Sequence, residues 1–386
     1  MMAVMYNKKK PVAEVDIENG VVKKIHEFYN KAYAPFYIRS ESTEKKLNEW
    51  LVKRRMPSDR EGMTAVYERF RHFASYPKFD AYGCMFSLSD QYWFCFDRHS
   101  QTWESGNFFT NPYPEDIGKA FFTPWEYPGD YLFKESPDLM TNGVLRKRWT
   151  RGDDGASYMI KAGSRQLRQE PISEVLASIM LKKLNIMPFV EYELVVEGMK
   201  LCSRCRNFVT KDTEFVPASH IFYQGKRHPD ESVLSCLLRM CRKFNIKNAK
   251  RDIEKMITVD LILGNEDRHL GNFGFIRNVE TLEFIGFAPL FDSGYSFVPG
   301  GRVPNEQDKN KRIIFTQKEK DIALAHNIHS VDMEKLEDYD EMFDLIDVYP
   351  EIDEEGRSYI KKKIIRAPEN IRNLVRTRDR GIAFTR

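Results

Sequence analysis

Residues 264–294 read GNEDRHLGNFGFIRNVETLEFIGFAPLFDSG and carry the three polar groups around which we predict the fold. Asp267 and Asn272 lie five positions apart, after an apolar helical run that ends near Gly264, a residue type that commonly ends helices. Two apolar runs then predict a hairpin, and Asp292 follows them as the first residue of an Asp-Ser-Gly triplet. Polar groups at the ends of such elements are held rigidly and remain open to a substrate.

This spacing is the one that phosphoryl transfer from ATP uses. One carboxylate orients and deprotonates the attacking hydroxyl, while an amide and a second carboxylate hold Mg²⁺ on the phosphates. Protein kinases place these groups as D-x-x-x-x-N followed by D-x-G, and the spacing here is the same. An Asp and an Asn five apart also occur by chance, and Asp-x-Gly is an ordinary turn. The hypothesis of a kinase therefore depends on the elements around the motif.

Composition limits the classes of protein that fit. With 386 residues, 42% of them hydrophobic and 30% charged, the chain is predicted to fold into two or three lobes rather than remain disordered. The net charge of +3 provides no strong field for nucleic acid. The N-terminus has no apolar leader-like run and no stretch is long enough to span a bilayer, so we expect a soluble, cytoplasmic protein. The single C-x-x-C, Cys202 and Cys205, has no second pair at ligand spacing and predicts idle thiols rather than zinc.

Residues 1–135 are predicted to form an N-terminal α/β extension. Residues 1–40 alternate loosely and predict a strand and turn, and the run STEKKLNEWLVKRRM predicts a helix with a basic rim at residues 53–55, Lys-Arg-Arg. The aromatic segment 82–96 is predicted to be rich in strands, and residues 100–135 to form aromatic-packed loops.

Residues 136–210 predict a small sheet with one helix packed on it. A strand at 144–150, a turn rich in Asp and Gly, and a strand at 157–162 form a hairpin; a helix opened by Pro171 follows, and two further strands at 190–196 and 199–209 complete the unit. Lys161 is either an edge-strand lysine that aids solubility or a phosphate-binding lysine. Glu174 either favours the helix dipole or pairs with Lys161.

Residues 211–386 predict a mainly helical region. Apolar positions mark helices around 233–241 and 253–261, the second of which leads into the Asp267 loop. The polar run 297–312 is predicted to be a long loop that covers a site. Residues 332–355 are acidic and residues 357–386 basic, which predicts the solvated faces of C-terminal helices, either separate or paired with each other. A basic tail that binds nucleic acid is the alternative.

With Lys161, Glu174, Asp267, Asn272 and Asp292 in this order, the chain resembles the HipA-type serine/threonine kinases. The resemblance covers roughly residue 136 to the C-terminus, and its most specific motif is NEDRHLGN at 265–272, which is similar to the N-x-D-x-H-x-x-N signature of that family. The segment SLSDQYW at 87–93 is similar to short bacterial HipA-like proteins that are sometimes labelled excisionase-like.

The resemblance implies an α+β, two-lobed protein-kinase-like fold, with a small β-rich N-lobe at 136–210, a mainly helical C-lobe at 211–386 and the N-terminal extension. It implies ATP and Mg²⁺ as cofactors, with Asp267 as proton acceptor and Asn272 and Asp292 as metal ligands. The residues expected to bind the nucleotide, in the phosphate loop, the lysine–glutamate pair, the hinge and the catalytic loop, are Asn142, Gly143, Lys147, Lys161, Glu174, Asn207, Phe208 and His269.

The chain departs from the usual kinase pattern in its phosphate loop. It has no G-x-G-x-x-G, and only Gly143 in MTNGVLRK stands where that loop is expected. In some HipA kinases a serine of this loop is autophosphorylated, and Ser136 and Thr141 are the nearest candidates here. The Asp-Arg-His order is also similar to the D-R-H-x-x-N of lipid kinases, which leaves the acceptor class open.

We therefore expect transfer of the ATP γ-phosphoryl group to a Ser or Thr hydroxyl of a protein, with autophosphorylation and an antitoxin-like partner as further expectations. Neither a membrane nor nucleic acid is an expected partner. Two alternatives remain: a catalytically silent, ATP-binding pseudokinase or regulator, and a DNA-binding, excisionase-like factor. The second would need a basic recognition face, and the basic faces of the sequence are residues 45–60 and the C-terminal tail.

Overall fold

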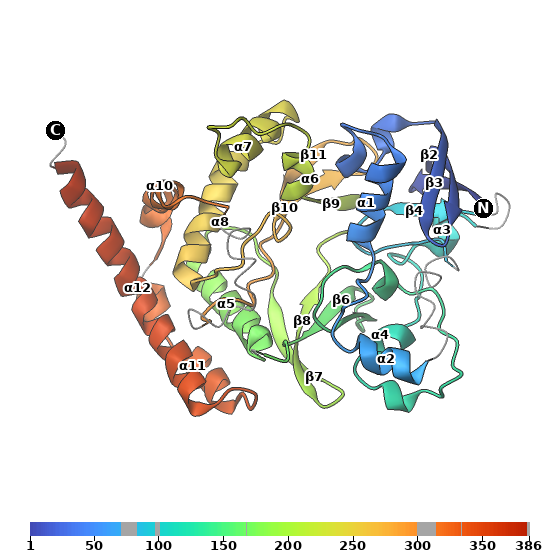
Figure 1. Cartoon of the computed structure of the whole chain (residues 1–386). Helices are drawn as coiled ribbons and strands as arrows, with labels where there is room; N and C mark the ends of the chain where they lie inside the picture. The colour runs from blue at the N-terminus through green and yellow to red at the C-terminus, as the bar shows by residue number, and fades with distance from the viewer. Residues whose placement is uncertain (71–82, 97–100, 167, 299–313, 333, 384–386) are drawn as a thin grey trace.

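The computed structural model describes residues 1–70, 83–96, 101–166, 168–298, 314–332 and 334–383. Within these ranges the strands form two four-stranded sheets and one three-stranded sheet, and neighbouring strands in all of them are antiparallel. Figure 1 shows the N-terminal sheet at one side of the molecule and the long C-terminal helix α12 (Glu354–Ala383) at the other.

The N-terminal extension is built on the first sheet, in which the strand order is β3-β2-β1-β4. Asn19 and Gly20 both have positive φ angles, 51° and 71°, as the tight turn between β2 and β3 requires. Strand β4 comes from far along the chain and pairs with β1, so the extension closes on itself. The four strands are β1 (Met2–Asn7), β2 (Lys10–Glu18), β3 (Val21–Phe28) and β4 (Tyr92–Cys95).

The predicted helix with a basic rim is α1 (Glu44–Arg54), which Thr43 caps by accepting a hydrogen bond from the Lys46 N–H. The prediction of a basic rim is wrong for two of its three residues, because Arg54 and Arg55 are only 6% and 8% exposed. The Arg54 guanidinium donates two hydrogen bonds, of 2.8 and 2.7 Å, to the Asp90 carboxylate. A carboxylate distant in sequence therefore turns a predicted surface charge into a buried ion pair.

The aromatic part of the extension contains less strand and more helix than predicted. Within the described part of residues 82–96, only Tyr92–Cys95 forms a strand, and residues 71–82 and 97–100 lie outside the described residues. The expected loops at 100–135 include short helices, since Thr102 forms a capping box that begins one of them. The short helices of the extension are α2 (Met63–Arg69), α3 (Trp103–Gly106) and α4 (Asp116–Ala120).

The second four-stranded sheet follows the predicted order of strand, strand, helix, strand and strand, and its spatial order is β5-β6-β8-β7. Helix α5 (Glu170–Leu184) packs against β7 and β8 of this sheet. The strands are β5 (Lys147–Arg151), β6 (Ser157–Ala162), β7 (Tyr192–Glu197) and β8 (Lys200–Arg206). We call these elements the N-lobe.

The C-lobe begins with a three-stranded sheet that was only partly predicted. Strands β10 (Gly274–Asn278) and β11 (Phe284–Phe287) are the predicted hairpin, whereas β9 (Thr213–Pro217) was not predicted. Helix α8 (Ala249–Leu263) ends at Gly264, which has a φ angle of 63° as predicted for a helix end. The other helices are α6 (Ala218–Phe222), α7 (Val233–Lys243), α10 (Gln317–Asn327) and α11 (Asp340–Val348).

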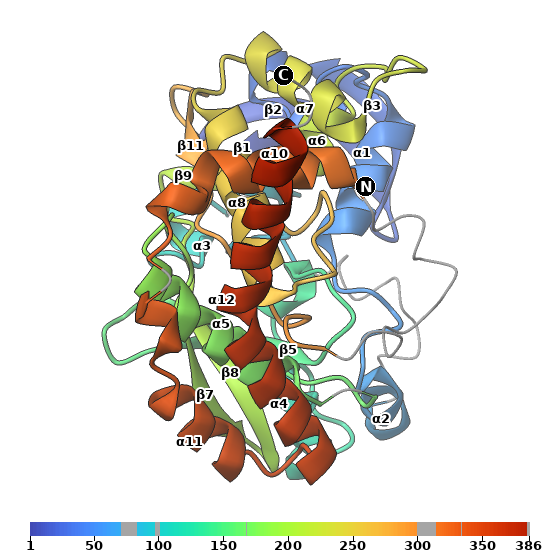
Figure 2. The ribbon, with the colours of Figure 1, turned by 90° about the vertical axis from the view of Figure 1, so that its left-hand side faces the viewer.

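The C-terminal helices cover the outside of the C-lobe. Figure 2 shows α12 running in front of α8, with which it is in contact. Ion pairs of 2.6 Å between Lys361 and Asp347 and of 2.7 Å between Arg372 and Glu337 join the acidic and basic regions, as expected. The predicted covering loop 297–312 falls almost entirely on residues 299–313, which lie outside the described residues.

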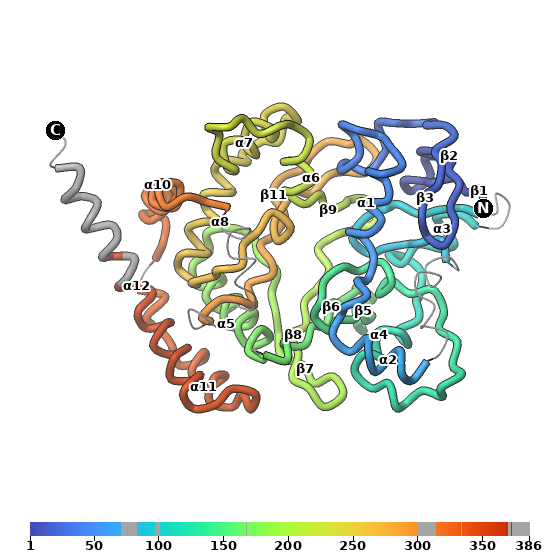
Figure 3. Tube along the Cα trace, in the orientation of Figure 1, coloured from blue at the N-terminus to red at the C-terminus, as the bar shows by residue number. Residues whose placement is uncertain are grey.

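A hydrophobic cluster and hydrogen bonds join the extension to the two lobes. One cluster combines Leu47 and Trp50 of the extension with Ile160 and Cys202 of the N-lobe sheet. On the C-lobe side, the Gln224 side chain donates to the Phe36 carbonyl at 2.8 Å, and Figure 3 shows the N-terminal trace beside β9 and α6. In the described residues no helix is both long and apolar enough to cross a membrane.

Candidate functional site

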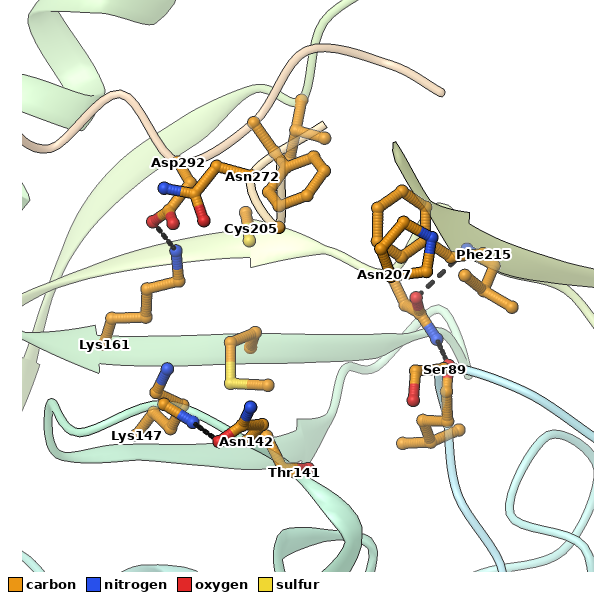
Figure 4. A pocket seen from close by; sticks show the side chains of 18 of the residues that line it. Ser89, Thr141, Asn142, Lys147, Lys161, Cys205, Asn207, Phe215, Asn272 and Asp292 are labelled. Atoms are coloured by element: carbon orange, nitrogen blue, oxygen red, sulfur yellow. Dashed lines mark hydrogen bonds and ion pairs between the residues drawn. The ribbon is translucent and has the colours of Figure 1, made fainter. Parts of the chain in front are cut away.

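A cavity of about 850 Å³ lies where the N-lobe sheet, the start of the C-lobe and the extension meet. Figure 4 shows two groups of side chains along it: Lys161, Asn272 and Asp292 at one end, and Asn207 and Phe215 at the other. Every site residue predicted from the sequence lines this cavity: Asn142, Gly143, Lys147, Lys161, Glu174, Asn207, Phe208, Asp267, His269, Asn272 and Asp292.

Lys161 occupies a central strand of the N-lobe sheet. Strand β6 lies between β5 and β8, which excludes the alternative of an edge-strand lysine. The Lys161 ammonium donates to Glu174 Oε1 at 2.9 Å and to Asp292 Oδ1 at 3.0 Å. Burial alone would lower the pKa of Lys161, but the two carboxylates raise it well above its usual value. Lys161 is therefore a fixed positive charge.

Glu174 lies in the second turn of α5 and is 3% exposed. Its Oε1 accepts from Lys161, and its Oε2 accepts a hydrogen bond from the Ser203 hydroxyl on β8. Both carboxylate oxygens are thus committed to the sheet. This geometry favours the lysine-pairing alternative over interaction with the helix dipole, because a buried carboxylate requires a partner.

Asp292 follows β11 and has a φ angle of 59°, in the left-handed region that few non-glycine residues adopt. Burial would raise the pKa of its carboxyl group, but the charges of Lys161 and Lys147 lower it below its usual range. The carboxylate is therefore ionised at neutral pH. Backbone strain of this kind is concentrated at functional sites, where the surrounding structure maintains it.

Arg268, which the sequence analysis assigned no role, connects the two loops that carry the polar groups. Its guanidinium donates to the carbonyls of Asn272 at 2.9 Å and Phe291 at 2.6 Å. It also donates twice, at 2.9 Å each, to the buried Asp260 carboxylate of α8. Arg268 therefore fixes the position of Asn272 relative to Asp292. The feature of the sequence that could have indicated this role is the position of Arg268 directly after Asp267.

The Asp267 loop is held by its own polar residues. The Asp267 N–H donates to Asn265 Oδ1 at 3.2 Å, and the Asn272 side-chain amide donates to the Asp267 carbonyl at 3.2 Å. The His269 ring accepts the Gly271 N–H at 3.0 Å through Nδ1. These contacts place Asp267, His269 and Asn272 on one turn of backbone that faces the cavity.

Lys147 lies directly opposite Lys161 in the pairing of β5 with β6. Burial, followed by the charges of Lys161 and Arg60, lowers the pKa of Lys147 to about 7. Gly143 has a φ angle of 105°, and a Cβ atom at this position would come within 2.1 Å of the Lys147 ammonium. The positive φ angle favours glycine here, and the missing side chain lets the lysine lie against the loop backbone.

Asn207 and Phe208 lie at the other end of the cavity, after β8. Phe208 packs against Phe215 and Phe291, with ring centroids 5.7 and 5.5 Å apart. The Asn207 side-chain amide donates to the Leu88 carbonyl of the extension at 2.9 Å. Sequence reasoning missed the extension residues that line this end, because nothing in the local sequence shows that a segment more than a hundred residues earlier lies here.

The two candidate autophosphorylation residues differ in position. Ser136 is 1% exposed, and its hydroxyl donates to the Asp138 carboxylate while capping the short helix η6 (Pro137–Met140). Thr141 lines the cavity, and its hydroxyl accepts the Trp149 indole N–H at 2.8 Å. Of the two, Thr141 is the one at the cavity.

The side chains at the Lys161 end fit a nucleotide triphosphate with Mg²⁺. Lys147 and Lys161 provide positive charge for phosphates, and the Asn272 amide oxygen and the Asp292 carboxylate are oxygen ligands of the kind that Mg²⁺ prefers. Mg²⁺ in such sites is commonly held by one or two protein oxygens and otherwise by phosphate and water. The donor set is therefore consistent with the expected cofactors.

The fold is the two-lobed, kinase-like fold. The structure is similar to HipA of Shewanella oneidensis MR-1, solved as a toxin–antitoxin complex with HipB and its operator DNA, with a TM-score of 0.60, 13% identity, and coverage of 98% of this chain and 99% of that one. This likeness confirms the HipA-like kinase fold. A proinflammatory kinase of Helicobacter pylori, CtkA, matches with a TM-score of 0.47 and 20% identity, over 61% of this chain and 95% of that one. No protein-family model matches the sequence, and no curated protein matches it at a significant level.

Proposed function

We propose that this protein is a HipA-like kinase that transfers the γ-phosphoryl group of ATP to a Ser or Thr hydroxyl of a protein. The observation that carries the proposal is the ion-paired Lys161, which bridges Glu174 and Asp292 in the cavity that Asp267 and Asn272 also line. Kinases use these groups together, since a lysine fixed by a glutamate positions the phosphates and an Asp–Asn pair holds the metal.

The residues at the Lys161 end would hold the phosphates and the metal. In this proposal Lys161 and Lys147 bind phosphate oxygens, Asn142 and Gly143 form the loop over them, and Glu174 keeps Lys161 in place. Mg²⁺ on Asn272 and Asp292 would neutralise charge on the phosphates. Asn207 and Phe208 would form the hinge beside the base, and His269 would lie near the nucleotide.

Asp267 is proposed to accept the proton of the acceptor hydroxyl. Its carboxylate belongs to a loop that is held in place by two hydrogen bonds, one that the Asp267 N–H donates to Asn265 and one that the Asp267 carbonyl accepts from Asn272. A base fixed in this way can align the hydroxyl for in-line attack without first losing loop entropy. The nucleotide would be bound by other residues, so the contribution of Asp267 should be to turnover.

A protein carrying the acceptor hydroxyl is the proposed substrate, and the cytoplasm the proposed location. The HipA structure was solved with the antitoxin HipB, and we extend an antitoxin-like protein partner to this chain as part of the proposal. Direct DNA binding through residues 45–60 is not supported, because three arginines in this range are buried: Arg54, Arg55 and Arg60.

The test is to incubate the purified protein with labelled ATP and Mg²⁺, and to map the phosphorylated residues by mass spectrometry. Asp267→Asn and Asp292→Asn serve as matched controls, each removing one charge without changing side-chain shape. Label on Ser or Thr of the wild type alone is the expected result. Unchanged label in Asp292→Asn would refute the assignment. Stabilisation by ATP without transfer would instead support a pseudokinase.

A further inference from the structure

The segment SLSDQYW at 87–93 lies against the connection between the two lobes. This connection, residues 207–212, runs from the end of β8 to the start of β9. The extension contacts its first residue and the strand that follows it, because the Asn207 amide donates to the Leu88 carbonyl at 2.9 Å and the Phe215 N–H donates to the Ser89 carbonyl at 3.2 Å. The extension thus hydrogen-bonds to the chain at the start of the crossing between the lobes and just after it.

Gln91 makes the central contact. It is 2% exposed, and its side-chain nitrogen donates to the carbonyls of Thr210 at 2.8 Å and Thr213 at 3.0 Å. Thr210 belongs to the connection, and Thr213 is the first residue of β9. One amide group therefore ties the connection to the C-lobe sheet. Buried hydrogen bonds of this kind fix geometry, because the buried Gln91 amide would lose its acceptors if the connection moved away, and an unsatisfied buried donor is costly.

Contacts from two sides hold the segment in place. The Arg54 guanidinium pairs with Asp90 and also donates to the Met85 carbonyl at 2.6 Å, which fixes the segment from the α1 side. From the β1–β2 turn, the Lys8 N–H donates to the Gln91 carbonyl at 2.9 Å, and the Lys8 ammonium lies 2.8 Å from the Asp212 carboxylate. The same turn thus contacts both the segment and the connection.

The segment also forms part of the cavity wall. Leu88, Ser89 and Asp90 line the cavity together with Asn207 and Phe208. Figure 4 shows Ser89 beside Asn207 and Phe215, at the end away from Lys161. The extension is therefore in direct contact with the space that a nucleotide in the proposed site would occupy.

We propose that residues 87–93 hold the interlobe connection in the position that admits a nucleotide, with Gln91 as a positioning residue and Ser89 as a wall of the nucleotide site. The proposal rests on the proposed function, since it takes the cavity to be a nucleotide site. If the connection leaves this position for part of the time, the apparent dissociation constant rises in inverse proportion to the competent fraction. Gln91 therefore acts on nucleotide affinity through the connection.

The test compares Gln91→Met with Asn48→Met. Asn48 is a matched control because its amide also makes two hydrogen bonds to backbone, at 2.8 Å each, but both go to Val22 inside the extension. The first measurement is hydrogen exchange of the backbone amides in residues 205–215 of the full chain. The second is the dissociation constant of a fluorescent ATP analogue with Mg²⁺, and unfolding temperature is recorded for both variants.

In Gln91→Met we expect faster exchange in residues 205–215 and an approximately tenfold higher dissociation constant, as a competent fraction of about one tenth would give. Asn48→Met should change neither the exchange rate in residues 205–215 nor the dissociation constant, although it should lower the unfolding temperature by a comparable amount. Exchange at 205–215 that is equal in the two variants would overturn the positioning role. Faster exchange with an unchanged dissociation constant would overturn its link to the nucleotide. A wild type that binds no nucleotide would refute the proposed function, and the exchange comparison would still decide whether Gln91 holds the connection.

Discussion

Lys161 and Asp292, which lie 131 residues apart in the sequence, form an ion pair of 3.0 Å between the N-lobe sheet and the loop after β11. Opposite charges hold Lys161 protonated and Asp292 ionised, since each shifts the pKa of the other in favour of its charged form. The pair connects the two lobes across the cavity. A Mg²⁺ ion bound to Asp292 and a phosphate bound to Lys161 would contact the same two side chains that form this ion pair.

Removing the Lys161 charge should destabilise the protein through Glu174. In Lys161→Met the carboxylate of Glu174, which is 3% exposed, loses its cation, and leaving one member of a buried pair costs about 3 kcal/mol. The double variant Lys161→Met with Glu174→Gln should recover most of this loss. Denaturant unfolding of the three proteins measures the difference, and a double variant no more stable than Lys161→Met would contradict the assignment.

Asp267→Asn should separate binding from turnover. We expect ATP to bind with unchanged affinity, because the carboxylate acts on the acceptor hydroxyl, and transfer to fall by about 10²–10⁴-fold, the usual contribution of a general base. Titration with a fluorescent nucleotide and initial rates of labelling provide the two values. Loss of nucleotide binding in a folded variant would show that Asp267 has another role.

Lys147 should make nucleotide binding depend on pH. Its pKa of about 7 leaves the amine largely neutral at pH 8.5, and the phosphates would favour the charged form. Binding at pH 8.5 should therefore take up a proton, whereas at pH 6 the amine is already charged. Calorimetric titration in buffers of different ionisation enthalpy measures this uptake. The Lys147→Met variant should take up fewer protons when it binds the nucleotide. An uptake equal to that of the wild type would exclude Lys147 as the group that gains the proton.

The same lysine should influence stability. Since the pKa of Lys147 is about 7 in the folded protein and 10.5 is its usual value, the unfolded chain binds more protons between these limits. The Lys147 contribution to the free energy of unfolding should therefore rise with pH across this window. Comparing wild type and Lys147→Met by urea unfolding at pH 7 and pH 9.5 isolates it. A difference between the two proteins that does not change with pH would contradict the shifted pKa.

Autophosphorylation, if the proposed transfer takes place within the chain, should occur on Thr141 and not on Ser136. The Ser136 hydroxyl is buried against Asp138, whereas Thr141 lines the cavity. Thr141→Val should abolish the loop label. Ser136→Ala should keep it while costing about 1 kcal/mol of stability through the lost cap. Peptide mapping of the two variants checks the assignment, and label on Ser136 would require the segment to leave its observed position.

The polar centre of the site could be predicted because local spacing determines it. Asp267 and Asn272 share one loop, and Lys161 and Glu174 follow from the order of strand and helix, so short stretches of sequence contain the signal. In the structure these four residues line one cavity, as that order predicts. Their chemical roles stay predictions until the variants above are measured.

The features that the sequence did not predict depend on pairs of residues that lie far apart in the chain. Strand β9 was not recognised because Glu214 points into the core, where it pairs with Arg277 on β10, so the usual apolar alternation is broken. Arg54 was expected on the surface because its partner Asp90 is remote. A buried charged residue needs a partner of opposite charge. The sequence alone does not show where along the chain that partner lies.

The position of Gln91 also has a consequence for biosynthesis. The two carbonyls that its side chain binds belong to residues added to the growing chain 119 and 122 positions later. The segment 87–93, which includes the start of strand β4, therefore leaves the ribosome well before the groups that complete its hydrogen bonding. Pairings over such separations slow folding, because a long loop must close before they form. The contacts of Gln91 with the connection must wait for the start of the C-lobe, and the cavity, which residues as late as Asp292 line, can form only late in translation.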